Sequence, residues 1–98
     1  MIVVIVNHFV KADMEKAAIA RIDKNGERMS RMPGYLFRFR LTSVETPLKL
    51  STITGWTARA DYDAWLEQRG PRGTQGVSPY ERVEREIHSV EQTDIQTT

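Results

Sequence analysis

The sequence predicts an α+β fold of the ferredoxin-like split βαβ kind, with a four-stranded antiparallel sheet and helices on one of its faces. Three observations support this fold class. The chain has 98 residues, enough for one domain with one modest core. Its hydrophobic periodicity changes in the order strand, helix, strand, strand, helix, strand. It also opens on a run, residues 2–6, that is apolar at every position, and such a run indicates a strand buried on both faces.

The first strand sets the orientation of the predicted sheet. Alternate side chains of a strand point to opposite faces, so Asn7 shares a face with Phe9 and His8 points the other way. We expect Asn7 to face the helix-side cleft and His8 to face away from it. An amide among apolar neighbours costs roughly 1–3 kcal/mol if it lacks a hydrogen bond, so Asn7 needs a structural partner or a ligand. One layer of helices covers only one sheet face, so the other should pack on a second copy of the protein.

The first helix is predicted to start at Asp13 as N-cap, because apolar residues then recur at three- and four-residue steps. These apolar positions are Met14, Ala18, Ile22, Met29 and Met32. Asn25-Gly26 is a turn dipeptide inside this pattern and predicts a kink or a division of the helix. Pro33-Gly34 then ends it.

Two strands follow, over residues 35–42 and about 48–56, joined by a turn at residues 43–47 that contains a proline. Alternation places Arg38 and Arg40 on one face of the earlier strand, where we expect them to pair with acids across a dimer surface. On the later strand, Trp56 falls on the face directed at the helices.

The second helix is predicted to have Thr57 as N-cap, with Tyr62 and Trp65 on its apolar stripe. Glycines and prolines at residues 69–79 deny that segment regular structure and make it a candidate lid. Residues 80–90 fit both a helix stripe and an edge strand. We assign a strand, because three strands would leave the sheet small. The domain is predicted to span residues 1–90, followed by a flexible tail at 91–98.

Composition excludes several function classes. A formal net charge of +1 and a pI near 8.1 provide no basic field for nucleic acid or a lipid surface. The chain has no cysteine, so thiolate metal sites and thiol nucleophiles are ruled out, and no His-x-x-x-His spacing suggests a metal site. The N-terminal apolar run is too short to span a membrane and lacks the flanks of a signal peptide, so we expect a cytoplasmic protein.

Four short motifs mark the element boundaries in order: Val-Ile-Val-Asn at 4–7, Met-Pro-Gly-Tyr at 32–35, Thr-Gly-Trp at 54–56 and Asp-Ala-Trp at 63–65. With these motifs, the chain from residue 2 to about 68 resembles the antibiotic biosynthesis monooxygenase family of small dimeric α+β barrels. The resemblance implies a homodimer whose two sheets close into a barrel. It also implies either of two chemistries, because the family includes oxygenases that oxidise anthrone- or quinol-like aromatics with O₂ and no cofactor, and relatives that bind and degrade haem.

The haem-degrading relatives use an asparagine on the first strand, a tryptophan on the second helix and a histidine further along that helix that ligates iron. Asn7 and Trp65 match the first two, whereas no histidine occurs between Leu66 and Ile87. The leading hypothesis is therefore a monooxygenase without cofactor or metal. Haem binding, and a non-catalytic dimeric module that binds small ligands, remain as alternatives.

The predicted catalytic residues are Asn7, which would hold a substrate oxyanion, and Trp65, which would stack on the ring. Both have structural alternatives, as a buried amide tied to the main chain and as a core tryptophan. The predicted substrate-binding residues are Trp56, Tyr62, Phe9 and Arg72. His8 is interpreted as structural, with an acid–base role left open.

Overall fold

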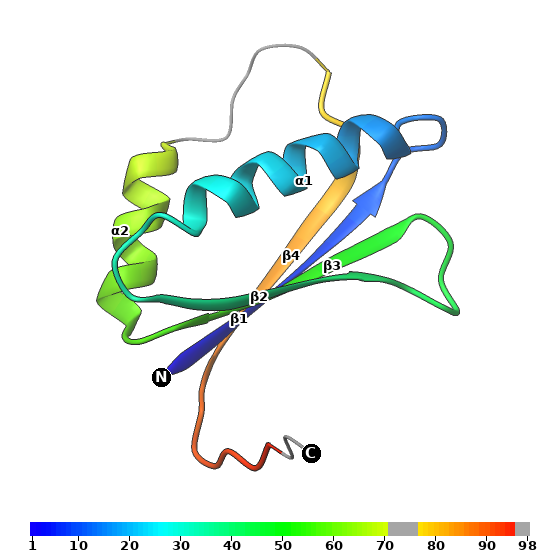
Figure 1. Cartoon of the computed structure of the whole chain (residues 1–98). Coiled ribbons are helices and arrows are strands. Elements are labelled where there is room, and N and C mark those ends of the chain that lie inside the picture. Colours follow the sequence, from blue (N-terminus) through cyan, green and yellow to red (C-terminus); the bar gives the residue numbers. More distant parts are fainter. Residues whose placement is uncertain (71–76, 96–98) are drawn as a thin grey trace.

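The computed structural model describes residues 1–70 and 77–95 and has the predicted element order (Figure 1). The elements are β1 (Ile2–Val10), α1 (Glu15–Met29), β2 (Tyr35–Thr42), β3 (Lys49–Trp56), α2 (Arg59–Arg69) and β4 (Tyr80–Ser89). The strands form one antiparallel sheet in the order β2-β3-β1-β4, and both helices cover the same face of it. The predicted α+β, ferredoxin-like fold is thus confirmed, and the segment from residue 80 is a strand.

β1 lies in the middle of the sheet between β3 and β4, which explains why it is apolar throughout. Its even-numbered residues face the helices: Val4 is 1% exposed and Val10 is 4% exposed. Its odd-numbered residues are only half-buried in the single chain. The helix face of β1 therefore carries the even-numbered side chains, which is the opposite of the orientation expected from the sequence.

The helix face holds two hydrophobic clusters at opposite ends of β1. One lies under α2 and contains Ile2, Val4, Trp56, Tyr62 and Trp65. The other lies under α1 and contains Val10, Ala18, Ile22, Leu50 and Tyr80. The middle of β1 and β3 lies between them and offers Val6, His8 and Thr52 to the helices. This gap between the two clusters is where the site lies.

α1 differs from its prediction in two respects. It begins at Glu15 with Met14 at the N-cap, and Asp13 adopts a left-handed conformation (φ 66°), so Asp13 is not the cap. The helix also runs unbroken through Asn25-Gly26. A glycine lowers helix propensity by about 1 kcal/mol, but this one lies against Arg38 of β2, where a Cβ would meet the guanidinium. Tertiary packing outweighs the local turn signal.

α2 begins at Arg59, and its N-cap is the extended Ala58, not Thr57. The Asp61 carboxylate accepts a hydrogen bond from the Ala58 backbone N–H (3.1 Å), so the cap is supplied by a side chain three residues inside the helix. Gly34, at φ 82°, lies where a Cβ would strike this carboxylate. Glycine at this turn therefore allows β2 to start directly beside the beginning of α2.

The sheet face away from the helices is open in the single chain. Phe39 is 57% exposed and Leu41 is 42% exposed, and Phe37 lies beside Phe39 with a ring separation of 5.6 Å. The homodimer stays a prediction that this face motivates. The predicted lid falls largely on residues 71–76, which lie outside the described part of the chain together with the end of the tail. Within the described ranges, no helix is long and apolar enough to cross a membrane.

Candidate functional site

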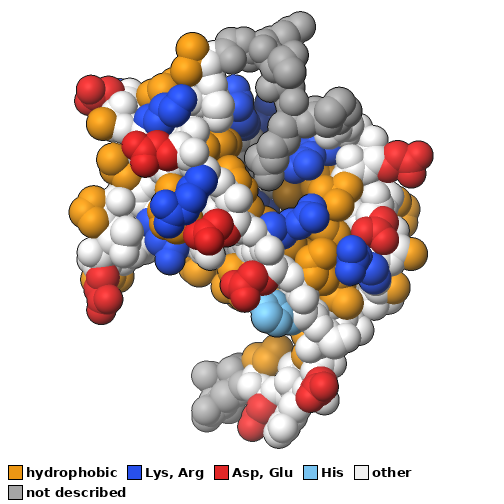
Figure 2. Space-filling view, turned by 180° about the vertical axis from the view of Figure 1, so that it is seen from behind, with side chains coloured by type: hydrophobic (Ala, Val, Ile, Leu, Met, Phe, Trp, Pro, Cys, Tyr) orange, Lys and Arg blue, Asp and Glu red, His pale blue; other side chains and the backbone are white. Residues whose placement is uncertain are grey.

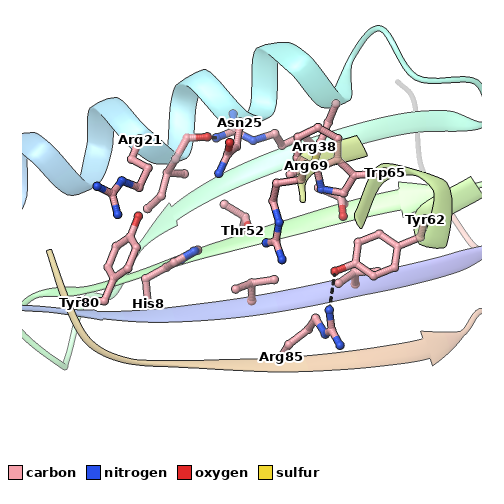
Figure 3. Close-up of a pocket in the computed structure, with 15 residues that line it drawn as sticks. His8, Arg21, Asn25, Arg38, Thr52, Tyr62, Trp65, Arg69, Tyr80 and Arg85 are labelled. Carbon is pink, nitrogen blue, oxygen red and sulfur yellow. Dashed lines mark hydrogen bonds between the residues drawn. The ribbon is translucent and has the colours of Figure 1, made fainter. Parts of the chain in front are cut away.

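A cavity of about 50 Å³ lies between the middle of the sheet and the two helices (Figure 3). Val4, Val6 and His8 of β1 form part of its floor, together with Thr52 and Thr54 of β3. Its other walls come from α1, α2, β2 and β4, so all six elements contribute. On the face seen in Figure 2, Lys and Arg side chains lie around a hollow in which apolar side chains are visible. The site is small and has a mixed lining, in which apolar side chains alternate with hydroxyl groups, an imidazole and arginines.

His8 is the one imidazole in the cavity lining. It is 7% exposed, and its Nδ1 lies 3.2 Å from the carbonyl oxygen of Leu50. A carbonyl oxygen only accepts hydrogen bonds, so Nδ1 carries the proton, and in the neutral ring Nε2 carries the lone pair. The ring of Tyr80 packs beside it, 5.0 Å between centroids. The strand thus holds an imidazole with a defined tautomer at the cavity wall.

This placement corrects the predicted orientation of the first strand. Asn7 points to the open face, and the expectation that it shares a cleft with Trp65 is wrong. Its Oδ1 accepts a hydrogen bond of 2.6 Å from the Ser51 hydroxyl, the residue opposite it on β3. The amide therefore has a structural partner there. The predicted catalytic role of Asn7 is not tested by this placement and stays a prediction.

The other predicted substrate-binding residues divide between several places. Phe9 also lies on the open face, where the guanidinium carbon of Arg82 lies 3.8 Å from its ring centroid. Trp56 is fully buried, donates from Nε1 to the Thr54 hydroxyl (3.0 Å) and is not among the lining residues, so it is core. Arg72 lies outside the described residues.

Two predicted residues, Trp65 and Tyr62, do line the cavity. Trp65 is 1% exposed, and the Arg28 guanidinium lies 5.3 Å from its ring centroid. Tyr62 is also buried, and its hydroxyl accepts a hydrogen bond from Arg85 Nη1 (3.3 Å; dashed in Figure 3). The short α2 helix thus provides an aromatic wall to the cavity, and Figure 3 shows this wall at the other end of the site from His8 and Tyr80.

Four arginines complete the lining: Arg21 of α1, Arg38 of β2, Arg69 of α2 and Arg85 of β4. Figure 3 shows the Arg69 guanidinium reaching down into the same space as Thr52 and the ring of Tyr62. Arg38 pairs with Asp23 (3.1 Å) and donates to the Ile22 carbonyl (3.1 Å), so it turns toward α1 and not toward a dimer surface as expected. Among the described lining residues there is no aspartate or glutamate.

The cavity is poor in metal ligands. In residues 1–70 and 77–95, no three histidine, cysteine, aspartate or glutamate side chains are grouped so as to hold a metal ion. His8 is the only ligand of this type in the lining. The arrangement offers one base, one aromatic wall and several cations, which suits proton transfer and the stabilisation of an anion.

The sequence reasoning placed His8 on the wrong face of β1 and did not bring the four lining arginines together, for different reasons. In β1 both faces are apolar, so alternation does not reveal which face the helices cover. Phe9 and Val10, which follow His8 on opposite faces, are both apolar, so the end of the strand gives no deciding signal either. The arginines come from four elements, and only the tertiary fold brings them together.

Solved structures of the same fold are similar over nearly the whole chain. The haem degrader MhuD from Mycobacterium tuberculosis, solved with two haems bound in its active site, is 19% identical, with 98% of this chain and 100% of that one covered and a TM-score of 0.74. SnoaB, a cofactor-independent oxygenase from Streptomyces nogalater, is 16% identical, with 94% of this chain and 95% of that one covered and a TM-score of 0.69. At such identities the likeness establishes the fold alone.

No curated protein sequence matches the chain. The family model described as antibiotic biosynthesis monooxygenase, however, matches residues 1–74, which include β1, α1, β2, β3 and α2. Every described element that lines the cavity, except β4, falls within this match. The chain therefore belongs to the antibiotic biosynthesis monooxygenase family.

Proposed function

We propose that the protein is a cofactor-independent monooxygenase that oxidises an electron-rich aromatic, such as an anthrone or a quinol, with O₂ in the helix-side cavity. The observation that carries the proposal is His8, whose Nδ1 is hydrogen-bonded to Leu50 so that Nε2 is the basic nitrogen, set in a cavity with Trp65 and Tyr62. The family membership supports the reaction class.

The base acts first. An anthrone has an acidic CH₂ group, and its carbanion is stabilised as an aromatic enolate. His8 Nε2 takes one proton from this group, which a positioned general base accelerates by roughly 10²–10⁴-fold. The guanidinium groups that line the cavity would stabilise the enolate as nearby cations once the substrate is bound.

The enolate then reduces oxygen itself. Its electron pair reduces O₂, a C–O bond forms, and the resulting peroxide takes up the proton held by His8. Loss of water breaks the O–O bond and the second C–H bond and leaves a carbonyl, so one CH₂ group and one O₂ become one C=O group and one water. The protein binds the ring, removes a proton and keeps bulk water away.

Trp65 and Tyr62 provide the wall against which the ring would lie. The cavity of about 50 Å³ holds only a few water molecules, so an aromatic substrate enters when long side chains at the rim rotate outward. Arg21 and Arg85 are largely exposed and can move at little cost. The homodimer belongs to the same proposal, because it would cover the open face that carries Phe39 and Leu41.

Haem fits the cavity only in part. Nε2 of His8 would be able to donate to a haem iron, since metal-ligating histidines usually donate their other N–H to a carbonyl or carboxylate. A cavity of about 50 Å³ admits neither a macrocycle nor an anthrone without displacement of its walls, so its volume does not decide between the two ligands. No step of the proposed reaction uses haem.

The experiment is oxygen uptake by chelator-treated protein with 1,8-dihydroxyanthrone, corrected for autoxidation in a protein-free solution. We expect uptake that falls by roughly 10²–10⁴-fold in His8→Gln, whose amide can still donate to Leu50. The matched control is His88→Gln, because the His88 side chain is 52% exposed and lies beside Glu86. Uptake no faster than in the protein-free solution, or unchanged in His8→Gln, contradicts the proposal.

Two further readouts separate the alternatives. A saturable Soret change on hemin titration that His8→Gln abolishes would favour haem binding. Weak binding of many aromatics without oxygen uptake would favour a non-catalytic ligand-binding module.

A further inference from the structure

The charge of the cavity lining is one-sided. Four arginines from four different elements line a cavity of about 50 Å³, and no carboxylate is among its described lining residues. Arg38 pairs with Asp23, which lies outside the lining, and Arg69 makes contacts of its own. Arg21 and Arg85 are therefore the rim guanidinium groups to which an anionic ligand would be attracted.

The arginines surround the aromatic wall instead of forming an isolated surface patch. Arg85 donates to the Tyr62 hydroxyl (3.3 Å), and its guanidinium carbon lies 5.8 Å from the ring centroid. Arg38 is mostly buried, with 18% of its side chain exposed, and is directed at α1, where it pairs with Asp23 and lies against Gly26. An anion bound by Arg85 would therefore lie beside the ring of Tyr62.

The type of anion follows from the donors. Guanidinium groups are planar forks that match the oxygens of a carboxylate or of a phosphate. Phosphate sites in proteins commonly add the backbone N–H groups of a helix N-terminus. Glu15 and Arg59, the first residues of α1 and α2, are not among the lining residues. The lining thus consists of side-chain cations without such a backbone cradle.

We infer that the aromatic ligand of this cavity carries a carboxylate group, which the arginines at the rim, Arg21 and Arg85 in particular, bind. The inference deepens the proposed oxygenase function by naming its substrate class, an aromatic acid. It also separates the group that is recognised from the group that reacts. The carboxylate binds at the cationic rim, and the oxidisable carbon lies within reach of His8.

The test is equilibrium binding by calorimetry with two ligands that cannot undergo the oxidation, anthraquinone-2-carboxylate and anthraquinone-2-carboxamide. They share one ring system and differ in charge. We expect the acid to bind roughly tenfold or more tightly, as hydrogen bonds to a charged group provide. The preference should shrink as salt is raised, because part of it is electrostatic attraction at an exposed rim.

Variants then assign the preference to residues. Arg21→Gln and Arg85→Gln change exposed side chains, so the fold should persist, and an unchanged circular dichroism spectrum checks this. Each should weaken binding of the acid several-fold and leave the amide unaffected. The matched control is Arg31→Gln, because Arg31 is 74% exposed on the side chain, pairs with Glu27 and lies outside the cavity. It should retain the full preference.

Equal affinity for acid and amide, no binding of the acid, or a preference that survives in the Arg21→Gln, Arg85→Gln double variant overturns the inference. Its failure is distinguishable from that of the proposed function. Selective binding of the acid without oxygen uptake by an anthrone carboxylate removes the oxygenase and keeps the carboxylate site. Oxygen uptake without any preference for the acid removes the carboxylate site and keeps the oxygenase.

Discussion

Replacement of Gly26 by alanine tests how α1 and the cavity wall are joined. In an isolated helix, Gly→Ala stabilises by about 1 kcal/mol. Here an alanine Cβ would overlap Arg38 Cζ, so the guanidinium must leave its place under the helix. The substitution therefore sets helix propensity against the contacts of Arg38.

The contacts that Arg38 would lose set the size of the expected change in the free energy of unfolding. Arg38 Nη2 donates to the Ile22 carbonyl at 3.1 Å, and a hydrogen bond from a charged donor contributes roughly 1.5–3 kcal/mol. Its ion pair with Asp23 is partly exposed and adds about 0.2–1 kcal/mol. After subtraction of the gain in propensity, we expect Gly26→Ala to lower the free energy of unfolding by about 1–3 kcal/mol, or the Tm by about 4–8 °C per kcal/mol.

A double-mutant cycle removes the ambiguity. An Arg38→Ala background removes the three atoms that lie nearest to a Cβ at Gly26, so Gly26→Ala should there raise the free energy of unfolding by about 1 kcal/mol. The sign of the effect thus reverses between backgrounds. Urea denaturation of the four proteins measures this, at one fixed concentration because the stability of the proposed dimer would depend on concentration. Stabilisation of similar size in both backgrounds would refute the placement of the guanidinium beneath α1.

Three further predictions concern the aromatic wall, the second helix and the open face. Trp65→Ala should lower the free energy of unfolding by roughly 3–5 kcal/mol, because the indole is 1% exposed, and a loss below 1 kcal/mol in urea would contradict its burial. Asp61→Ala should cost about 1 kcal/mol by loss of the α2 cap, and an unchanged Tm would count against that contact. Asn7→Ala should cost about 0.5–1.5 kcal/mol through its bond to Ser51 and leave oxygen uptake unchanged, whereas uptake reduced as far as in His8→Gln would put the reaction on the open face.

The element order could be predicted from the sequence because each element has its own periodicity and its own punctuation. Pro33-Gly34 precedes a strand that begins at Tyr35 as predicted, and the segment from Tyr80 pairs with β1 as a strand. Both N-caps lie one residue later than predicted, at Met14 instead of Asp13 and at Ala58 instead of Thr57. At α2 the Asp61 carboxylate accepts the hydrogen bond of the cap, a role that local preference assigns to Thr57. Which residue serves as the N-cap depends on the tertiary contacts of the turn that precedes the helix.

The candidate site was predictable only in part. Trp65 and Tyr62 follow from the stripe of one amphipathic helix, which the sequence displays directly. The choice between Asn7 and His8 depends on which face of β1 meets the helices, and a strand that is apolar on both faces leaves this undecided. The cationic lining is a tertiary property, since its arginines occupy positions 21, 38, 69 and 85.

The central claim is that His8 is a base, held as one tautomer, in the cavity that binds the aromatic ring. The chain contains two histidines, so the imidazole nitrogens of His8 and His88 can be assigned by ¹⁵N NMR with one variant. We predict that His8 carries its proton on Nδ1 and that its Nε2 resonance shifts when anthraquinone-2-carboxylate is added, while those of His88 stay unchanged. A proton on Nε2 of His8, or an Nε2 resonance that does not shift when the ligand is added, would contradict this role of His8.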